Sequence, residues 1–228
     1  MKWRSLEESN SVDLRPLNEI FAERKTMIEK YVPAEVRAVH QGVVDQLKRD
    51  RIAERSLQPG SAAPVFELKD HTGKRVSSAD LLSRGRLVIC FFRGRWDPFC
   101  CGQLEAMNQV FDQINEAGAN LIAVSPQIEK QAFFMADQHK LRFPLLSDPG
   151  NQVAKKFGLA YRVPDQQKEI YQRVFVNLPL VNGDQSWELP IPATYILERD
   201  GTVLYANANP DYTDRPEPFD ILDALSKP

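Results

Sequence analysis

The stretch from Arg86 to Leu104 reads RLVICFFRGRWDPFCCGQL. Its apolar part ends at Phe92, and an apolar run of that length is typical of a buried strand. Asp97 and Pro98 then favour a helix start, because Asp is a preferred N-cap residue and Pro is preferred at the first helical position. The sequence therefore predicts a buried strand that leads directly into a helix, with Cys100 in the first turn of that helix.

Strand and helix patterns alternate on both sides of this stretch. Apolar residues at helical spacing predict helices at 98–117, 129–139 (with Phe133 and Phe134 inward), 153–157 and 219–225. Strands are expected at 86–92, 120–124 and 143–146, with hairpins at 63–76 and 194–206, the latter turning at Asp200-Gly201. Segment 160–189 is expected to be irregular. Alternation of this kind predicts an α/β fold, and the hairpins make its central sheet mixed and flanked by helices.

The first 57 residues predict an N-terminal helical extension. Apolar side chains recur at spacings of three and four on either side of Pro33, which suits the first turn of a second helix. These two amphipathic helices either pack on the main domain or form a homodimer contact. Gln58-Pro59-Gly60 is typical of a linker, so the main domain is expected to span residues 58–228.

Composition excludes several classes of protein. The chain has 228 residues, 43% of them hydrophobic, and a net charge of −2. These values exclude a largely disordered chain, and the charge balance argues against nucleic acid as the main partner. No apolar run is long enough to span a membrane, and the first ten residues lack the apolar core of a signal peptide. The expected location is the cytoplasm.

Three cysteines, Cys90, Cys100 and Cys101, are too few for a disulfide scaffold. The three histidines lie far from them in sequence, so no metal site is expected. Cys90 lies inside the apolar strand and is interpreted as a core residue.

Cys100 is the candidate nucleophile. A thiol in the first turn of a helix lies near the positive end of the helix dipole, and the charges of Arg93 and Arg95 would also favour the thiolate. The carboxylate of Asp97 would act in the opposite direction if it faced the sulfur. We expect the arginines to prevail, because a capping carboxylate can instead accept from the backbone amide of Cys100.

Several motifs together resemble the peroxiredoxin family, also called the alkyl hydroperoxide reductase and thiol-specific antioxidant group. They are PGSAAPVFEL at 59–68, the turn at 91–104, LSDPG at 146–150, PIPATYIL at 190–197 and DYT at 211–213. The resemblance covers residue 58 to the end. It implies a thioredoxin-like fold and reduction of peroxides by a cysteine, with no metal or organic cofactor.

The turn departs from the family pattern P-x-x-x-T-x-x-C. The pattern aligns its cysteine with Cys100, but Arg93 replaces its proline and Asp97 its threonine. The family's activating arginine falls near Pro192, so Arg93 or Arg95 would replace it. Ile191-Pro192 resembles the cis-proline beside the thiol of thioredoxins. Asp97 also replaces the first cysteine of the subgroup's C-P-Y-C, which disfavours disulfide exchange within this turn.

The resemblance implies a one-cysteine, thioredoxin-dependent peroxidase. Cys100 would attack hydrogen peroxide or an alkyl hydroperoxide and become a sulfenic acid, which thioredoxin or another external thiol would reduce. Trp96 would pack over the turn, Gln103 would join a hydrogen-bond network, and Cys101 is a poorly aimed resolving thiol. Two alternatives stay open. They are a redox-inactive binding protein with the same fold and a single-cysteine thiol–disulfide oxidoreductase.

Overall fold

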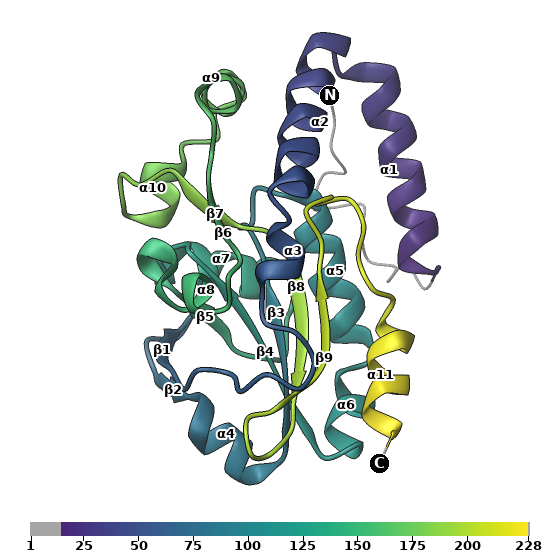
Figure 1. Cartoon of the computed structure of the whole chain (residues 1–228), viewed down its shortest axis with the longest axis vertical. Coiled ribbons are helices and arrows are strands. Elements are labelled where there is room, and N and C mark those ends of the chain that lie inside the picture. The colour runs from purple at the N-terminus through teal and green to yellow at the C-terminus, as the bar shows by residue number, and fades with distance from the viewer. Residues whose placement is uncertain (1–14, 228) are drawn as a thin grey trace.

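A computed structural model describes residues 15–227 and is built around a seven-stranded mixed sheet. The strand order is β2-β1-β5-β4-β3-β8-β9 (Figure 1). Strands β3, β4 and β5 are parallel, and the other pairings are antiparallel. The strands are β1 (Glu67–Asp70), β2 (Arg75–Ser77), β3 (Arg86–Phe91), β4 (Ala119–Ser125), β5 (Leu145–Ser147), β8 (Ala193–Leu197) and β9 (Val203–Ala208). This confirms the predicted mixed sheet.

Strand β3 lies inside the sheet, between β4 and β8. Successive side chains of a strand point to opposite faces. Leu87, Ile89 and Phe91 therefore enter one core cluster, and Val88 and Cys90 enter the other. Both faces are covered, which explains why the strand is an unbroken apolar run. Burial raises the pKa of Cys90 to about 12 and fits its interpretation as a core residue.

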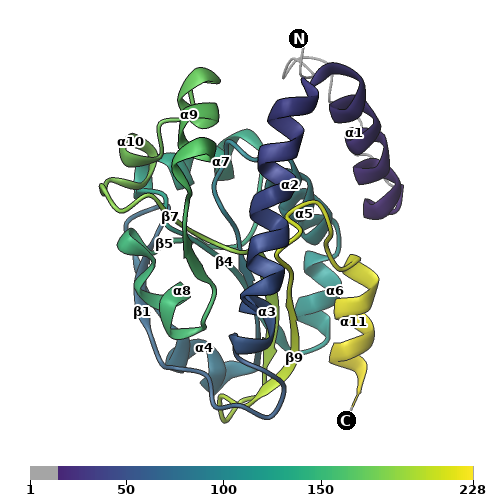
Figure 2. The ribbon, with the colours of Figure 1, turned by 45° about the horizontal axis from the view of Figure 1, so that its top comes forward.

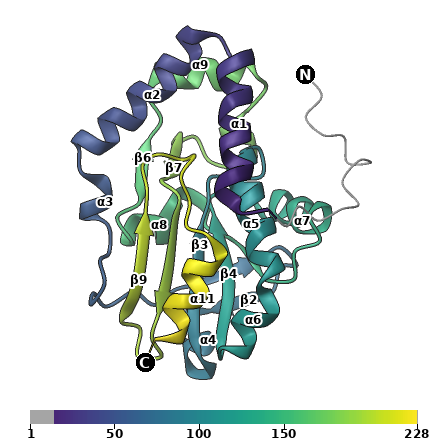
Figure 3. The ribbon, with the colours of Figure 1, turned by 90° about the vertical axis from the view of Figure 1, so that its right-hand side faces the viewer.

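Helices cover both faces of the sheet, and Figure 3 places α3 on one side and α6 on the other. Side chains of α2 (Ala34–Arg49), α3, α4 and α8 enter the first cluster, and those of α5, α6, α7 and α11 enter the second. The helices after the N-terminal pair are α3 (Ile52–Arg55), α4 (Ser78–Arg84), α5 (Pro98–Gln109), α6 (Phe111–Glu116), α7 (Glu129–Gln138), the 3-10 turn η1 (Pro149–Asn151), α8 (Gln152–Lys156) and α11 (Pro218–Ser226).

Three local expectations were wrong. The predicted helix at 98–117 is two helices, because Val110 leaves helical geometry between α5 and α6. Phe133 and Phe134 point outward, with 49% and 43% of their surface exposed, since Ala132, Met135 and Ala136 form the buried face of α7. Segment 160–189 is ordered as β6 (Ala160–Arg162), α9 (Asp165–Arg173), α10 (Leu178–Asn182) and β7 (Glu188–Pro190), with β6 and β7 paired.

The N-terminal extension forms helices α1 (Leu17–Tyr31) and α2 (Ala34–Arg49), which pack on the rest of the chain (Figures 1 and 2). Phe21 of α1 meets the ring of Phe99 edge-on at 5.0 Å, and Leu47 of α2 joins the first core cluster. The structure thus shows packing on the main domain. A homodimer through these helices stays a prediction. Among residues 15–227, no helix has the length and apolarity that crossing a membrane requires.

Replacing Phe21 with alanine is expected to lower the free energy of unfolding by about 3–5 kcal/mol, the usual cost of a buried Phe→Ala change. The reason is that this side chain is only 2% exposed and fills the contact between α1 and α5. Urea denaturation would measure the loss. Phe175→Ala is the matched control, because Phe175 is 95% exposed, and it should change little. Equal stabilities of the two variants would show that α1 is not packed as described.

Candidate active site

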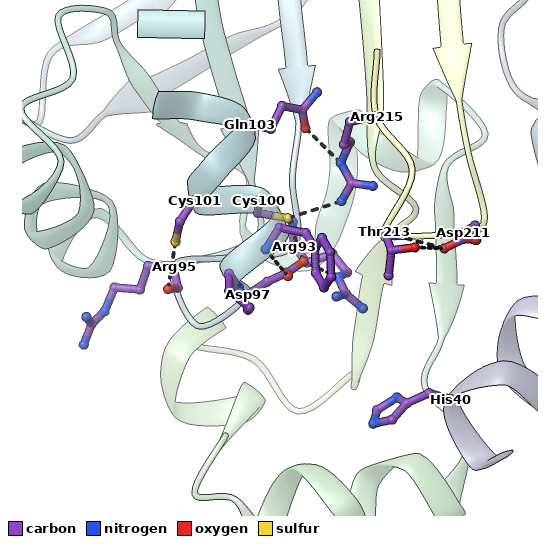
Figure 4. Close-up of polar contacts among 12 residues, drawn as sticks. His40, Arg93, Arg95, Asp97, Cys100, Cys101, Gln103, Asp211, Thr213 and Arg215 are labelled. Atoms are coloured by element: carbon purple, nitrogen blue, oxygen red, sulfur yellow. Dashed lines mark hydrogen bonds and ion pairs between the residues drawn. The ribbon is translucent and has the colours of Figure 1, made fainter. Parts of the chain in front are cut away.

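The turn between β3 and α5 places Cys100 at the centre of a buried polar cluster (Figure 4). Asp97 is the N-cap of α5, and its Oδ1 accepts from the amide of Phe99 at 3.0 Å. The capped amide is therefore that of Phe99 and not, as expected, that of Cys100. Pro98 occupies the first turn, and its carbonyl accepts a hydrogen bond from Arg24 of α1. Helix α1 thus supports the start of the helix that carries Cys100.

Three groups surround the sulfur of Cys100, which has no exposed surface. The thiol donates to Asp97 Oδ2 at 2.8 Å, and the backbone amide of Arg93 donates to the sulfur at 3.4 Å. The guanidinium of Arg215 approaches the sulfur with Nη2 at 3.8 Å. A carboxylate, an amide and a guanidinium therefore meet at one thiol, so an acceptor for its proton and donors for developing negative charge are all in place.

The balance of charge around Cys100 differs from the expectation. Burial, followed by the Asp97 carboxylate, raises the pKa of Cys100 to about 11, although Arg215 and Arg93 act to lower it. The predicted depression of the thiol pKa is therefore wrong. The reason is that one oxygen of Asp97 caps the helix while the other faces the sulfur. Near neutral pH, Cys100 is a thiol that is hydrogen-bonded to a carboxylate.

Arg93 forms a buried ion pair with Asp97 at 2.7 Å. Its guanidinium carbon lies 4.0 Å from the ring centre of Tyr212 and 5.1 Å from that of Trp96. Burial would raise the pKa of Asp97, but the charge and hydrogen bond of Arg93, together with Arg215, hold it below its usual value. Asp97 is therefore ionised. Trp96 packs against Arg93 and also against Tyr171, at 5.1 Å between ring centres.

Arg95 and Cys101 point away from the reactive sulfur. The Arg95 side chain donates to Gln131 at 2.6 Å on the surface, so the expectation that it activates Cys100 is wrong. Cys101 donates to the backbone carbonyl of Arg95 at 3.3 Å, on another side of α5 from Cys100 (Figure 4). Burial, and then the neighbouring Cys100, raise the pKa of Cys101 as well. The outward turn of Arg95 leaves Arg93 and Arg215 as the cations near the thiol.

Arg215 is the residue that sequence reasoning missed. It follows the last strand, and its Nε donates to Gln103 Oε1 at 3.0 Å while its Nη1 donates to the carbonyl of Asp214. Gln103 in turn donates to the hydroxyl of Thr194 at 3.1 Å. Gln103 thus lies in a hydrogen-bond network that aims the guanidinium at the sulfur. Arg215 is only 4% exposed. The available signal in the sequence was its position two residues after the DYT motif at 211–213.

Pro192 differs from its expected geometry. The Ile191–Pro192 bond is trans, and no cis peptide bond occurs within residues 15–227. Ile191 donates its amide to the carbonyl of Leu159, and the carbonyl of Pro192 accepts from the amide of Asn209. These bonds hold the segment extended as it enters β8, and a trans bond satisfies them. In the described part of the chain, no cluster of three histidine, cysteine or acidic side chains could hold a metal ion.

A mixed sheet with a cysteine in the first turn of the helix that follows a central strand defines a class, the thiol proteins of thioredoxin-like fold. Residues 59–206 match the AhpC/TSA family, and the chain belongs to this family, the peroxiredoxins. The matched region begins after the N-terminal helices. The resemblance inferred from the sequence motifs is thereby confirmed.

Relatives and solved structures agree with this assignment. Peroxiredoxin Q of Oryza sativa subsp. japonica is 30% identical over 71% of this chain and 64% of its own length. Peroxiredoxin Q of Arabidopsis thaliana is 31% identical over 66% of this chain and 60% of its own length. The chain thus spans less than two thirds of these relatives.

Among solved structures, peroxidoxin BcpB from Mycobacterium tuberculosis superposes with a TM-score of 0.59 and 21% identity, covering 74% of this chain and 96% of its own. Peroxiredoxin Q of Xanthomonas campestris gives 0.55 and 19%, covering 70% of this chain and 89% of its own. At these identities the structures support the fold.

Proposed function

We propose that this protein is a peroxidase that reduces hydroperoxides through Cys100. The observation that carries the proposal is the 2.8 Å hydrogen bond from the Cys100 thiol to a buried, ionised carboxylate, with a guanidinium on the same sulfur. The names of the relatives, peroxiredoxin Q, support it. The redox-inactive alternative would not need a proton acceptor and two cations at one thiol.

The chemistry balances with the groups present. The sulfur of Cys100 attacks the terminal oxygen of the peroxide, so that an S–O bond forms as the O–O bond breaks. The thiol proton passes to Asp97 Oδ2 and then to the departing oxygen, which leaves as water or an alcohol. Cys100 becomes a sulfenic acid, and the peroxide is reduced by two electrons. Asp97 is the general base and then the general acid, and it ends the cycle as it began.

The two arginines have different roles in this proposal. Arg215 lies on the sulfur and stabilises the negative charge that develops on the departing oxygen, as preorganised donors do at an oxyanion. Arg93 keeps Asp97 ionised and holds it against the thiol, so in this step it acts through Asp97. Gln103 positions Arg215 in the same way.

An external thiol regenerates the enzyme in this proposal. It attacks the sulfenic acid and releases water, and a second thiol then frees Cys100 as the disulfide of the reductant forms. Thioredoxin is a reductant of the required chemistry. Cys101 is bonded to the Arg95 carbonyl and directed away, which supports an external resolving thiol. The three free cysteines support a reducing compartment such as the cytoplasm.

Replacing Arg215 with alanine is expected to lower kcat/KM for peroxide about 100-fold, the usual effect of losing one oxyanion donor. Removal of this cation also raises the pKa of Cys100 further, because Arg215 acts to lower it. Steady-state peroxide consumption measures the first effect. Arg95→Ala is the control and should leave the rate unchanged, since its side chain bonds to Gln131 instead. Equal losses in the two variants would contradict this assignment.

A further inference from the structure

A small pocket lies beneath α2, on the side of the active site that Arg93 faces. It is enclosed by α2, β6, α9, the segment before β8 and the loop after β9, and its polar lining comes from His40, Arg93, Tyr161, Gln167 and Tyr212. His40 reaches from α2 toward this side of the site (Figure 4). The cavity volume is about 10 Å³, about the space that one water molecule needs.

The pocket adjoins the reactive sulfur through two hydrogen bonds. Arg93, which lines the pocket, donates from Nε to Asp97 Oδ2 at 2.7 Å. Cys100 donates to the same oxygen at 2.8 Å. The distance between the Cys100 sulfur and Arg93 Nε is therefore at most the sum of these two hydrogen-bond lengths. Arg93 and Asp97 thus connect the wall of the pocket to the thiol.

The polar groups of the pocket suit a neutral ligand. Arg93 is already paired with Asp97. Burial and the charge of Arg93 lower the pKa of His40 to about 4, so its ring is neutral near neutral pH. Gln167 is 1% exposed, and its Oε1 has no hydrogen-bond partner among residues 15–227. Gln167 and Arg93 both line the pocket, and an acceptor together with a cationic donor suits a small molecule that both donates and accepts hydrogen bonds.

Apart from Tyr161 and Tyr212, the rest of the wall is apolar and limits the size of the ligand. Helix α2 supplies Val43, Val44 and Leu47, and the segment before β8 supplies Ile191 and Pro192. Each of the three α2 side chains is less than a tenth exposed, so a bulky ligand would have to displace packed side chains. Helix α2 lies outside the region that matches the AhpC/TSA family, residues 59–206. The part of the size limit that α2 sets is therefore a property of this chain's N-terminal extension.

We infer that this pocket is the entry subsite for the peroxide and that α2 restricts it to hydrogen peroxide, to the exclusion of bulky alkyl hydroperoxides. The inference rests on the proposed peroxidase function. Hydrogen peroxide is the peroxide nearest to water in size, is neutral, and donates two hydrogen bonds while accepting others. Gln167 Oε1 accepts from it and Arg93 donates to it, and Leu47 and Val44 are the residues that determine selectivity.

Second-order rate constants for oxidation of the prereduced full-length protein test this inference, with hydrogen peroxide and cumene hydroperoxide as the probes. The wild type is expected to prefer hydrogen peroxide by about 100-fold or more, the scale on which a tight pocket rejects extra bulk. Leu47→Ala should narrow this preference about tenfold by speeding the reaction with cumene hydroperoxide. Val44→Ala, a smaller change, should act in the same direction and guards against a folding defect of the first variant.

Leu82→Ala is the matched control. Leu82 lies in the same core cluster as Leu47 and is equally exposed, at 8%, but it does not line the pocket. It should lose similar stability and keep the wild-type preference. Two results would overturn the subsite while leaving the peroxidase proposal intact. One is that the wild type reacts equally fast with both peroxides. The other is that Leu47→Ala, Val44→Ala and Leu82→Ala all show the same preference for hydrogen peroxide. No oxidation of Cys100 by either peroxide would overturn the proposed function and the subsite with it.

Discussion

Replacing Cys100 with serine is expected to abolish peroxide reduction, with a loss of at least about 1000-fold. The reason is that a serine hydroxyl cannot serve as the nucleophile at this position. Attack on a peroxide depends on the thiolate character of the cysteine sulfur, which a hydroxyl lacks. Serine is close in size to cysteine and should keep the hydrogen bond to Asp97 Oδ2. The loss would therefore be chemical and not structural.

Two matched controls use the other cysteines. Cys101→Ser should retain activity with an external thiol, because its sulfur is bonded to the Arg95 carbonyl. Cys90→Ala removes a buried sulfur from strand β3 and should cost stability without stopping the reaction. Peroxide consumption and the mass of the peroxide-treated protein are the measurements. If Cys100→Ser consumes peroxide as fast as the wild type, Cys100 has no part in the chemistry.

Asp97→Asn has the second large effect. Asparagine can still cap α5 but cannot carry the thiol proton to the departing oxygen, so kcat/KM is expected to fall about 100- to 10,000-fold, the contribution of general acid–base catalysis. The pKa of Cys100 should fall at the same time, because the Asp97 carboxylate raises it in the wild type. A lower thiol pKa together with a slower reaction distinguishes a proton carrier from a group that merely suppresses ionisation.

The same substitution leaves Arg93 buried without its carboxylate, which costs about 3–5 kcal/mol of stability. Activity must therefore be measured well below the unfolding temperature of the variant. Asp97→Glu is the rescue variant, since it keeps the charge and should recover part of the rate. If Asp97→Asn reacted faster with peroxide as its thiol pKa fell, Asp97 would be an inhibitor of the thiol and the proposed proton transfer would be wrong.

Much of the fold could be predicted because its signals are local. Strand β3 is buried on both faces and therefore reads as a continuous apolar run. Asp97 and Pro98 mark the start of α5, and Pro33 separates α1 from α2. Segment 160–189 was harder, because its elements are short. Helix α9 carries only two buried apolar side chains, Ile170 and Tyr171, among polar ones.

The active site could be predicted only in part, because its chemistry depends on contacts across the chain. Arg215 meets Cys100 over a separation of 115 residues, and no spacing along the sequence reports that contact. The orientation of Asp97 was also hidden. Its two oxygens serve the helix and the sulfur at once, which depends on the Arg93 ion pair behind it. The sign of the thiol pKa shift follows from this packing and from complete burial.

The most direct test of the account compares thiolate formation with peroxide reduction across pH. The ultraviolet absorbance of the thiolate is followed in a Cys90→Ala, Cys101→Ser protein. Subtracting the spectrum of the same protein carrying Cys100→Ser isolates the signal of Cys100. Thiolate should appear with a pKa near 11, while the peroxide rate is already at its plateau near pH 7, because Asp97 takes the proton during attack. A thiolate present at neutral pH, or a peroxide rate that rises about tenfold with each pH unit up to the thiol pKa, would contradict the account.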